Sequence, residues 1–134
     1  MFRASLIVAA LVVVTPVVAH AGSPHFVSCS VTRVDDSIVV FGKEAGLGNE
    51  AQITVVTTAD ALCINNGSKH PRATNKESLS SQEDVPVQNG KAEFDAALVA
   101  SFDPDCSPPM SVAFVNVTVC DVTNDICCEV SSTF

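Results

Sequence analysis

The sequence predicts an all-β domain, because three of its features occur together. Apolar and polar residues alternate with the period of two that strands show, turn residues separate these segments at short intervals, and apolar residues nowhere recur at the three- and four-residue spacing of a helix. About seven to eight short strands of this kind are typical of an antiparallel immunoglobulin-like β-sandwich. The core tryptophan of true immunoglobulin domains is missing, and a small barrel is the alternative.

The first 21 residues predict a secretory signal peptide. One cation, Arg3, precedes an apolar run over residues 4–14, and a proline break and the small-residue site Ala19-His20-Ala21 follow it. The run is shorter than the roughly 20 apolar residues that span a bilayer. We therefore expect residues 1–21 to be removed and residues 22–134 to form one secreted, extracellular domain.

Six cysteines in an exported chain of this size predict a disulfide-stapled fold. A zinc site is the competing interpretation, but there is no Cys-x-x-Cys, and adjacent Cys127 and Cys128 would point to opposite faces of a strand. Many pairings of the six remain possible. The cysteines are Cys29, Cys63, Cys106, Cys120, Cys127 and Cys128.

The first half of the domain predicts four strand segments and two loops. The strands are expected over residues 26–34, 37–41, 51–58 and 61–64, with a bulge between the last two. Val27, Cys29 and Val31 share one face of the first strand, and Asp35-Asp36 turns it into the second. Residues 42–49 contain three glycines and read as a loop, and the polar stretch 65–83 reads as the longest loop.

The second half contains the strongest hairpin signal. Asn89-Gly90 suits the positive φ angles of a type I′ turn and would join residues 85–88 to 91–102. The inward face of the second arm would carry Ala92, Phe94, Ala96, Leu98, Ala100 and Phe102, and the outward face Lys91, Glu93, Asp95 and Ser101. A proline-rich turn over 103–109 then precedes strands at 111–121 and 126–130.

The charge and the aromatic content of the chain disfavour several classes of binding partner. The net charge is −8, and loss of Arg3 with the leader makes it −9. Such a surface repels phosphate backbones and anionic lipids, so nucleic acid and membranes are not expected partners, and a soluble monomer is expected. The chain has no Trp and no Tyr, which disfavours a polysaccharide-binding module.

The candidate ligand site is the loop over residues 65–77. It gathers Lys69, His70, Arg72 and Lys76 in an otherwise acidic chain. The functional interpretation is a positive pocket for a carboxylate, a sulfate or an acidic group of an extracellular partner. The alternative is an ordinary surface loop whose cations pair with neighbouring acids.

No catalytic, metal or cofactor motif stands out. Only His25 and His70 remain after cleavage, and the motifs of serine hydrolases, zinc proteases and phosphate loops are missing. Asp103 and Asp105 fall well short of a calcium ligand set. We expect a non-catalytic binding or interaction protein, such as a host-directed effector or a cell-surface protein. The alternative is a hydrolase with a pair of acids facing a cleft.

Two sequons predict glycosylation if the source is eukaryotic. They begin at Asn66, in the long loop, and at Asn116, within a strand. The second requires Asn116 to face solvent.

Several short motifs together resemble a group of small secreted proteins of filamentous fungi and actinobacteria. They are Gly42-Lys43-Glu44-Ala45-Gly46-Leu47-Gly48, the run from Cys63 to Pro71 with Asn75-Lys76-Glu77, Gln88-Asn89-Gly90-Lys91, and Pro104-Asp105-Cys106. The resemblance covers residues 26–123 and implies no activity. It implies that Cys63 pairs with Cys106. The other four cysteines would then pair among themselves and fasten the first strand to the terminal hairpin.

Overall fold

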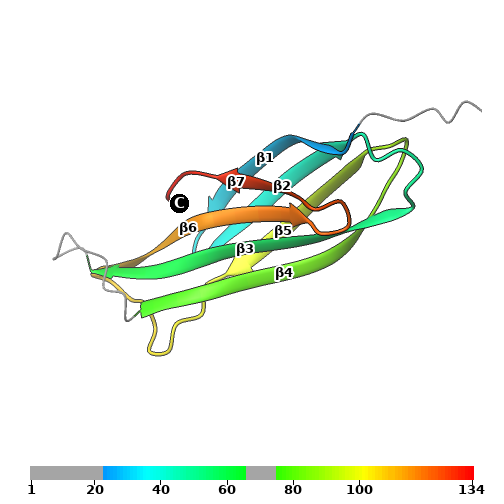
Figure 1. Ribbon diagram of the computed structural model, residues 1–134. Helices are drawn as coiled ribbons and strands as arrows, with labels where there is room; N and C mark the ends of the chain where they lie inside the picture. The colour runs from blue at the N-terminus through cyan, green and yellow to red at the C-terminus, as the bar shows by residue number, and fades with distance from the viewer. Residues whose placement is uncertain (1–22, 66–74) are drawn as a thin grey trace, which may run out of the picture.

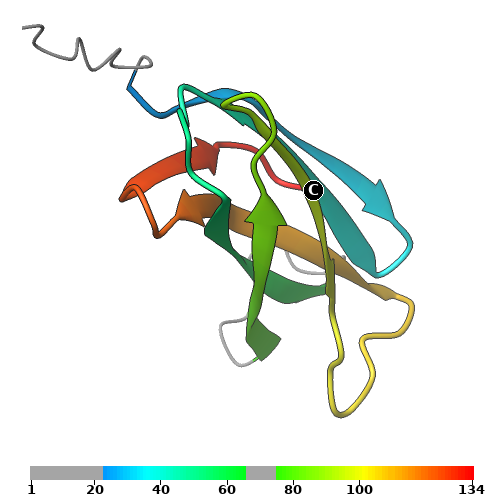
Figure 2. The ribbon, with the colours of Figure 1, turned by 90° about the vertical axis from the view of Figure 1, so that its right-hand side faces the viewer.

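Two antiparallel sheets pack face to face (Figures 1 and 2), as expected for a β-sandwich. The computed structural model describes residues 23–65 and 75–134, which form seven strands and no helix. The strands are β1 (His25–Val34), β2 (Ser37–Ala45), β3 (Gln52–Asn65), β4 (Lys76–Pro86), β5 (Ala92–Val99), β6 (Met110–Asp121) and β7 (Ile126–Val130). One sheet has the order β1-β2-β5 and the other β4-β3-β6-β7. Across these residues no helix is long and apolar enough to cross a membrane.

The core fills the space between the sheets with every second residue of the central strands. The fully buried side chains include Ile38, Val40, Ile53, Val55, Phe114, Val117 and Val119. The inward row predicted for β5 is confirmed from Ala92 to Leu98, and Glu93 and Asp95 are exposed as expected. Because a strand alternates its faces, these rows fix the register of both sheets.

β2 is longer than the sequence predicted. Residues 42–49 were expected to form a loop, but β2 continues to Ala45, and Gly42 pairs with Cys29 on one side and with Phe94 on the other. A Cβ on Gly42 would lie 2.1 Å from the Phe94 ring. This glycine therefore makes room for an aromatic side chain within a strand, and the loop begins only at Gly46, whose φ is 76°.

Gly42→Ala should lower the free energy of unfolding by about 1–3 kcal/mol, because the added methyl group overpacks the core against Phe94. Urea denaturation measures the loss. Combining Gly42→Ala with Phe94→Leu should recover part of it, since the smaller side chain removes the clash. If the stability loss of the double variant equalled the sum of the two single losses, residue 42 would not be in steric conflict with the Phe94 ring.

β4 occupies part of the predicted long loop. Residues 76–83 were assigned to that loop because they are polar, yet they pair with β3 from Lys76↔Leu62 to Glu83↔Val55. β4 lies at the edge of its sheet, so its outward serines face water, while Leu79 and Val85 turn toward the core. An edge strand needs few apolar residues, and this concealed it in the sequence.

The Asn89-Gly90 turn has the predicted backbone but not the predicted hairpin. The φ angles are 53° and 73°, as a type I′ turn requires. Only Gln88 and Lys91 pair across it, through two backbone hydrogen bonds of 2.9 and 3.0 Å. β4 then pairs with β3, and β5 with β2, so the turn carries the chain from one sheet to the other.

Gly90→Val should cost about 1 kcal/mol or more, because a β-branched residue resists positive φ. Its Cβ would also lie 3.4 Å from the backbone nitrogen of Gly48. Asn89→Gly, at the neighbouring positive-φ position, is the control and should be nearly neutral. Thermal unfolding of both variants measures the difference, and equal midpoints would show that the turn does not constrain residue 90.

Two bulges adjust the expected register. In β1 the pairing shifts between Phe26 and Ser28, so Val27 is exposed and does not share a face with Cys29 and Val31 as predicted, and Phe26 packs on the core instead. In the other sheet β3 is continuous, and the expected bulge at residues 59–60 has its extra residue on β6. Asn116, at φ 54°, lies there between the pairs Thr58↔Thr118 and Asp60↔Val115.

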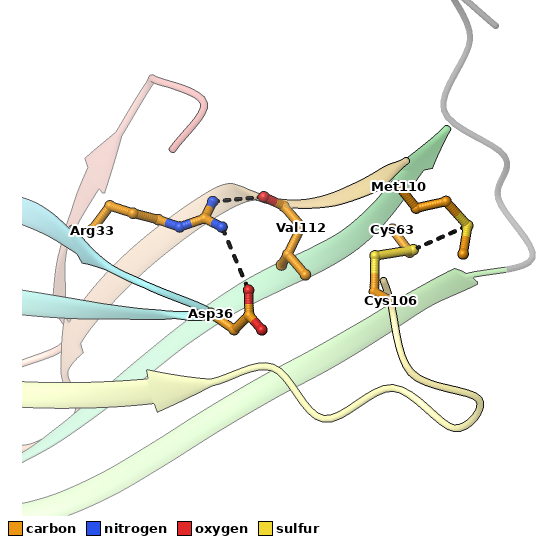
Figure 3. The surroundings of a disulfide bond; sticks show 6 residues. All are labelled: Arg33, Asp36, Cys63, Cys106, Met110 and Val112. Carbon is orange, nitrogen blue, oxygen red and sulfur yellow. Dashed lines mark hydrogen bonds and ion pairs between the residues drawn. A yellow bond between two sulfur atoms is a disulfide. The ribbon is translucent and has the colours of Figure 1, made fainter. Parts of the chain in front are cut away.

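All six cysteines form disulfides, which is compatible with an extracellular protein. Cys63 joins Cys106, the pair that the resemblance implied (Figure 3). Cys29 of β1 joins Cys128 of β7 across the two sheets, and Cys120 joins its directly paired neighbour Cys127. Cys29–Cys128 fastens the first strand to the terminal hairpin, whereas Cys120–Cys127 lies within that hairpin, so adjacent Cys127 and Cys128 serve different bridges.

Arg33 closes the edge of the sandwich beside β1 (Figure 3). Its guanidinium donates hydrogen bonds to the carbonyl oxygens of Val112 (2.6 Å) and Phe134 (3.0 Å) and lies 5.1 Å from the centre of the Phe114 ring. Oδ1 of Asp36 lies 4.0 Å from Nη2 of Arg33. The sequence showed this residue only as one of the few cations, whereas the structure makes it a link between β1 and β6.

Candidate functional site

Only one of the four predicted ligand-binding residues belongs to the described structure. Lys69, His70 and Arg72 lie outside the described residues. Lys76 begins β4, and its Nζ lies 3.4 Å from Oδ2 of Asp60 on β3. This ion pair neutralises the one cation of the predicted site whose position is described.

Asp60 gathers three donors on the outer face of the larger sheet. Its carboxylate accepts hydrogen bonds from Asn116 Nδ2 (2.9 Å) and Ser78 Oγ (3.2 Å) in addition to the Lys76 ion pair. The hydrogen bond from Asn116, with those of Lys76 and Ser78, lowers the pKa of Asp60. A shallow hollow of about 420 Å³ surrounds it, lined also by Thr58, Ser80 and Thr118. Asp60 was not predicted from the sequence, although its outward position on β3 was a usable signal.

Asn116 meets the condition set for glycosylation. It is exposed, because the β6 bulge places it outside the regular alternation. Its amide nitrogen, the atom that a glycan would modify, donates to Asp60. A glycosylated amide keeps one hydrogen, so this hydrogen bond is compatible with a glycan on Asn116. Asn66 lies outside the described residues.

A pair of acids is buried between the sheets. Glu44 lies in the inward row of β2 and Asp121 at the end of β6, and both side chains are 0% exposed. Asp121 accepts hydrogen bonds from the backbone N–H groups of Thr123 (2.9 Å) and Asn124 (3.2 Å) and from Asn124 Nδ2 (2.7 Å). Both oxygens of Glu44 lack such a donor. Burial, helped by the charges of Asp121 and Glu50, raises the pKa of Glu44 to about 8.

The Glu44 and Asp121 side chains are not accessible to a substrate. Neither acid lines the hollow at Asp60, the groove of about 470 Å³ beside β6 and β7, or the hollow beside the 89–90 turn. A glycosidase needs its two carboxyl groups on either side of a bound sugar, with room for water. Within residues 23–65 and 75–134, no group of three or more His, Cys, Asp or Glu side chains could hold a metal ion.

The outer face of the smaller sheet carries an apolar patch, which we define as Val34, Val39, Phe41, Ala97 and Val99. The strand register places these residues side by side, through the pairs Val39↔Ala97 and Ser37↔Val99 and the link Val34↔Ser37. The exposed fractions of Val34, Phe41 and Val99 are 50%, 44% and 61%. This patch was not predicted from the sequence.

Acids dominate the rim of the apolar patch. Asp95 pairs with Phe41, and the Asp35-Asp36 turn follows Val34 directly. At the other end Glu93 forms a 3.4 Å ion pair with Lys43, the cation of this outer face. The patch is therefore an apolar surface with a negative rim.

No family model, no curated protein and no solved structure matches this chain. Its function is therefore inferred from its own residues.

Proposed function

We propose that the chain is a secreted, non-catalytic binding protein that docks an extracellular partner on the apolar patch. The observation that carries the proposal is the exposure of Val34, Phe41 and Val99 together on one sheet face. Apolar patches rimmed by polar residues on soluble proteins commonly mark interaction sites. Host-directed effector and cell-surface roles both require such a surface.

The fold alone gives no reason for these outward apolar residues. A two-sheet sandwich buries only the inner face of each sheet, and the outer face is ordinarily polar. The outer face of the larger sheet carries Thr54, Thr58, Ser78, Ser80 and Thr118, and its outward apolar residues Val56, Leu62 and Ile64 are only partly exposed. The contrast between the two outer faces supports a binding role for the smaller sheet.

Charge favours one kind of partner. A second copy of the chain would bring the carboxylates of two rims together, and both copies are strongly acidic. An aliphatic surface bordered by Lys or Arg would instead pair with Asp35 and Asp95, whereas Asp36 and Glu93 already lie beside Arg33 and Lys43. We therefore propose a protein partner with an aliphatic centre and a cationic rim.

The buried acid pair weighs against the hydrolase alternative. Glu44 and Asp121 are both fully buried in the core, where a substrate has no access, and the hollow at Asp60 on the described outer surface is shallow. The loop that carries Lys69, His70 and Arg72 stays the expected place for an anionic group of the partner. Its contribution would add to that of the patch.

A synthetic amphipathic peptide, with leucines on one face and lysines on the other, is the probe for this proposal. Fluorescence anisotropy should show binding that weakens at least about tenfold in the double variant Phe41→Ser/Val99→Ser, because the centre of the patch is lost. Val122→Ser is the matched control, since Val122 is 53% exposed but lies on the β6–β7 turn. Equal binding by the double variant and the control would refute the patch as the docking surface.

A further inference from the structure

Glu44 occupies an unusual environment for an acid. It lies in the inward row of β2, beside Phe26 of β1 and Ala92 of β5 in the strand register. Among the described residues, the charged groups that act on it are both carboxylates, Asp121 from β6 and Glu50 from the loop after β2. Asn124 connects these two acids, because its Nδ2 donates to Glu50 Oε2 (3.1 Å) and to Asp121 Oδ2 (2.7 Å). Within residues 23–65 and 75–134, no cation compensates these acids.

A single proton would resolve this arrangement. An ionised carboxylate only accepts hydrogen bonds, so two ionised acids cannot bond to each other, and burying both without a partner is costly. A protonated Glu44 becomes a donor, and the Asp121 carboxylate beside it is an acceptor. Asp121 already accepts hydrogen bonds from three N–H donors, and Glu44 accepts none. The proton therefore belongs on Glu44.

We propose that protonated Glu44 donates a hydrogen bond to the Asp121 carboxylate and so links β2 to the end of β6. This hydrogen bond holds the two sheets together at mildly acidic pH and weakens above neutrality. The two residues belong to opposite sheets, so this contact crosses the core. Loss of the proton leaves two buried carboxylates in repulsion at this end of the sandwich.

The direction of the pH dependence follows from where the proton binds. The pKa of Glu44 is about 8 in the folded protein against 4.5 ordinarily, so between these values the folded chain retains a proton that the unfolded chain has released. The contribution of Glu44 to stability is therefore greatest below about pH 4.5, falls as the pH rises, and levels off above about 8. One proton makes the unfolding equilibrium constant rise by up to about tenfold per pH unit in this window.

Glu44→Gln isolates this contribution from other titrating groups. Burial also raises the pKa of Glu83, and hydrogen bonds lower that of Asp60, so the pH profile of the whole protein is a sum. A glutamine amide can donate to Asp121 at every pH. As the pH rises from 5 to 8, the unfolding constant of the wild type should therefore increase relative to that of the variant by up to about tenfold per pH unit. Urea denaturation of both proteins measures this ratio. Glu93→Gln, at an exposed position, should follow the wild type throughout.

The wild-type protein supplies a second test that needs no variant to fold. The carboxyl ¹³C resonance of Glu44, followed by NMR, should titrate with a midpoint near 8. A midpoint near 4.5, or parallel stability profiles for wild type and Glu44→Gln, would overturn the proposal. Stabilisation of the wild type but not the variant by Ca²⁺ at pH 8 would also overturn it, because the pair would then be a cation site.

Discussion

Replacing Cys29 and Cys128 with serine should lower the free energy of unfolding by about 4–5 kcal/mol, the largest loss among the three disulfides. The bridge closes a segment with a sequence separation of 99 residues, and cross-linking restricts the unfolded chain more as that separation grows. The same bridge ties the edge strand β1 of one sheet to the edge strand β7 of the other. A loss of this size approaches the whole stability of many small domains.

The other two bridges supply the controls. Cys63–Cys106 closes 43 residues and should be worth about 4 kcal/mol, whereas Cys120–Cys127 closes 7 residues within one hairpin and should be worth about 2 kcal/mol. Each pair is changed to serine and unfolded in urea under the same conditions. If removal of Cys120–Cys127 cost as much as removal of Cys29–Cys128, the bridges would not act chiefly on the unfolded chain.

Ala96→Asp should cost about 3 kcal/mol or more, because it places an unpaired carboxylate in the core. Ala96 is 7% exposed and belongs to the inward row of β5, next to Phe94 and Leu98. A buried charge without a partner is among the few changes that produce effects of this size. The variant is expected to unfold at much lower denaturant concentration or to fail to fold.

Ala97→Asp is the matched control for that variant. It makes the same chemical change one residue further along β5, where the side chain is exposed on the outer face. Its cost should stay below about 1 kcal/mol, as for most surface substitutions. Similar losses for the two variants, measured by urea denaturation, would show that the faces of β5 are assigned wrongly.

The sequence predicted the fold wherever one face of a strand is clearly apolar. The alternation in β5 and the paired cysteines led directly to a disulfide-stapled sandwich. The prediction was wrong where packing, rather than pattern, decides the structure. Gly42 looked like part of a flexible loop but accommodates the Phe94 ring, and the polar strand β4 is stabilised by its partner β3.

The candidate sites were harder to predict, because they combine residues from distant parts of the chain. Glu44 follows the inward parity of Ile38 and Val40, but its partner Asp121 comes from the other sheet, and no sequence spacing joins them. The apolar patch was hidden for another reason. Val39 and Val40 are both apolar, so alternation in β2 did not show which residues face outward until the pairing with β5 was known.

Docking on the apolar patch predicts which residues a bound peptide perturbs, and NMR measures this residue by residue. Amide resonances of the isotope-labelled protein are followed by NMR while the leucine–lysine peptide is added. The proposed function predicts that the largest shifts occur on the outer face of β1, β2 and β5, centred on Phe41 and Val99, and that the face around Asp60 stays unchanged. Shifts confined to residues 65–77, or spread evenly over both sheets, would contradict docking on the apolar patch.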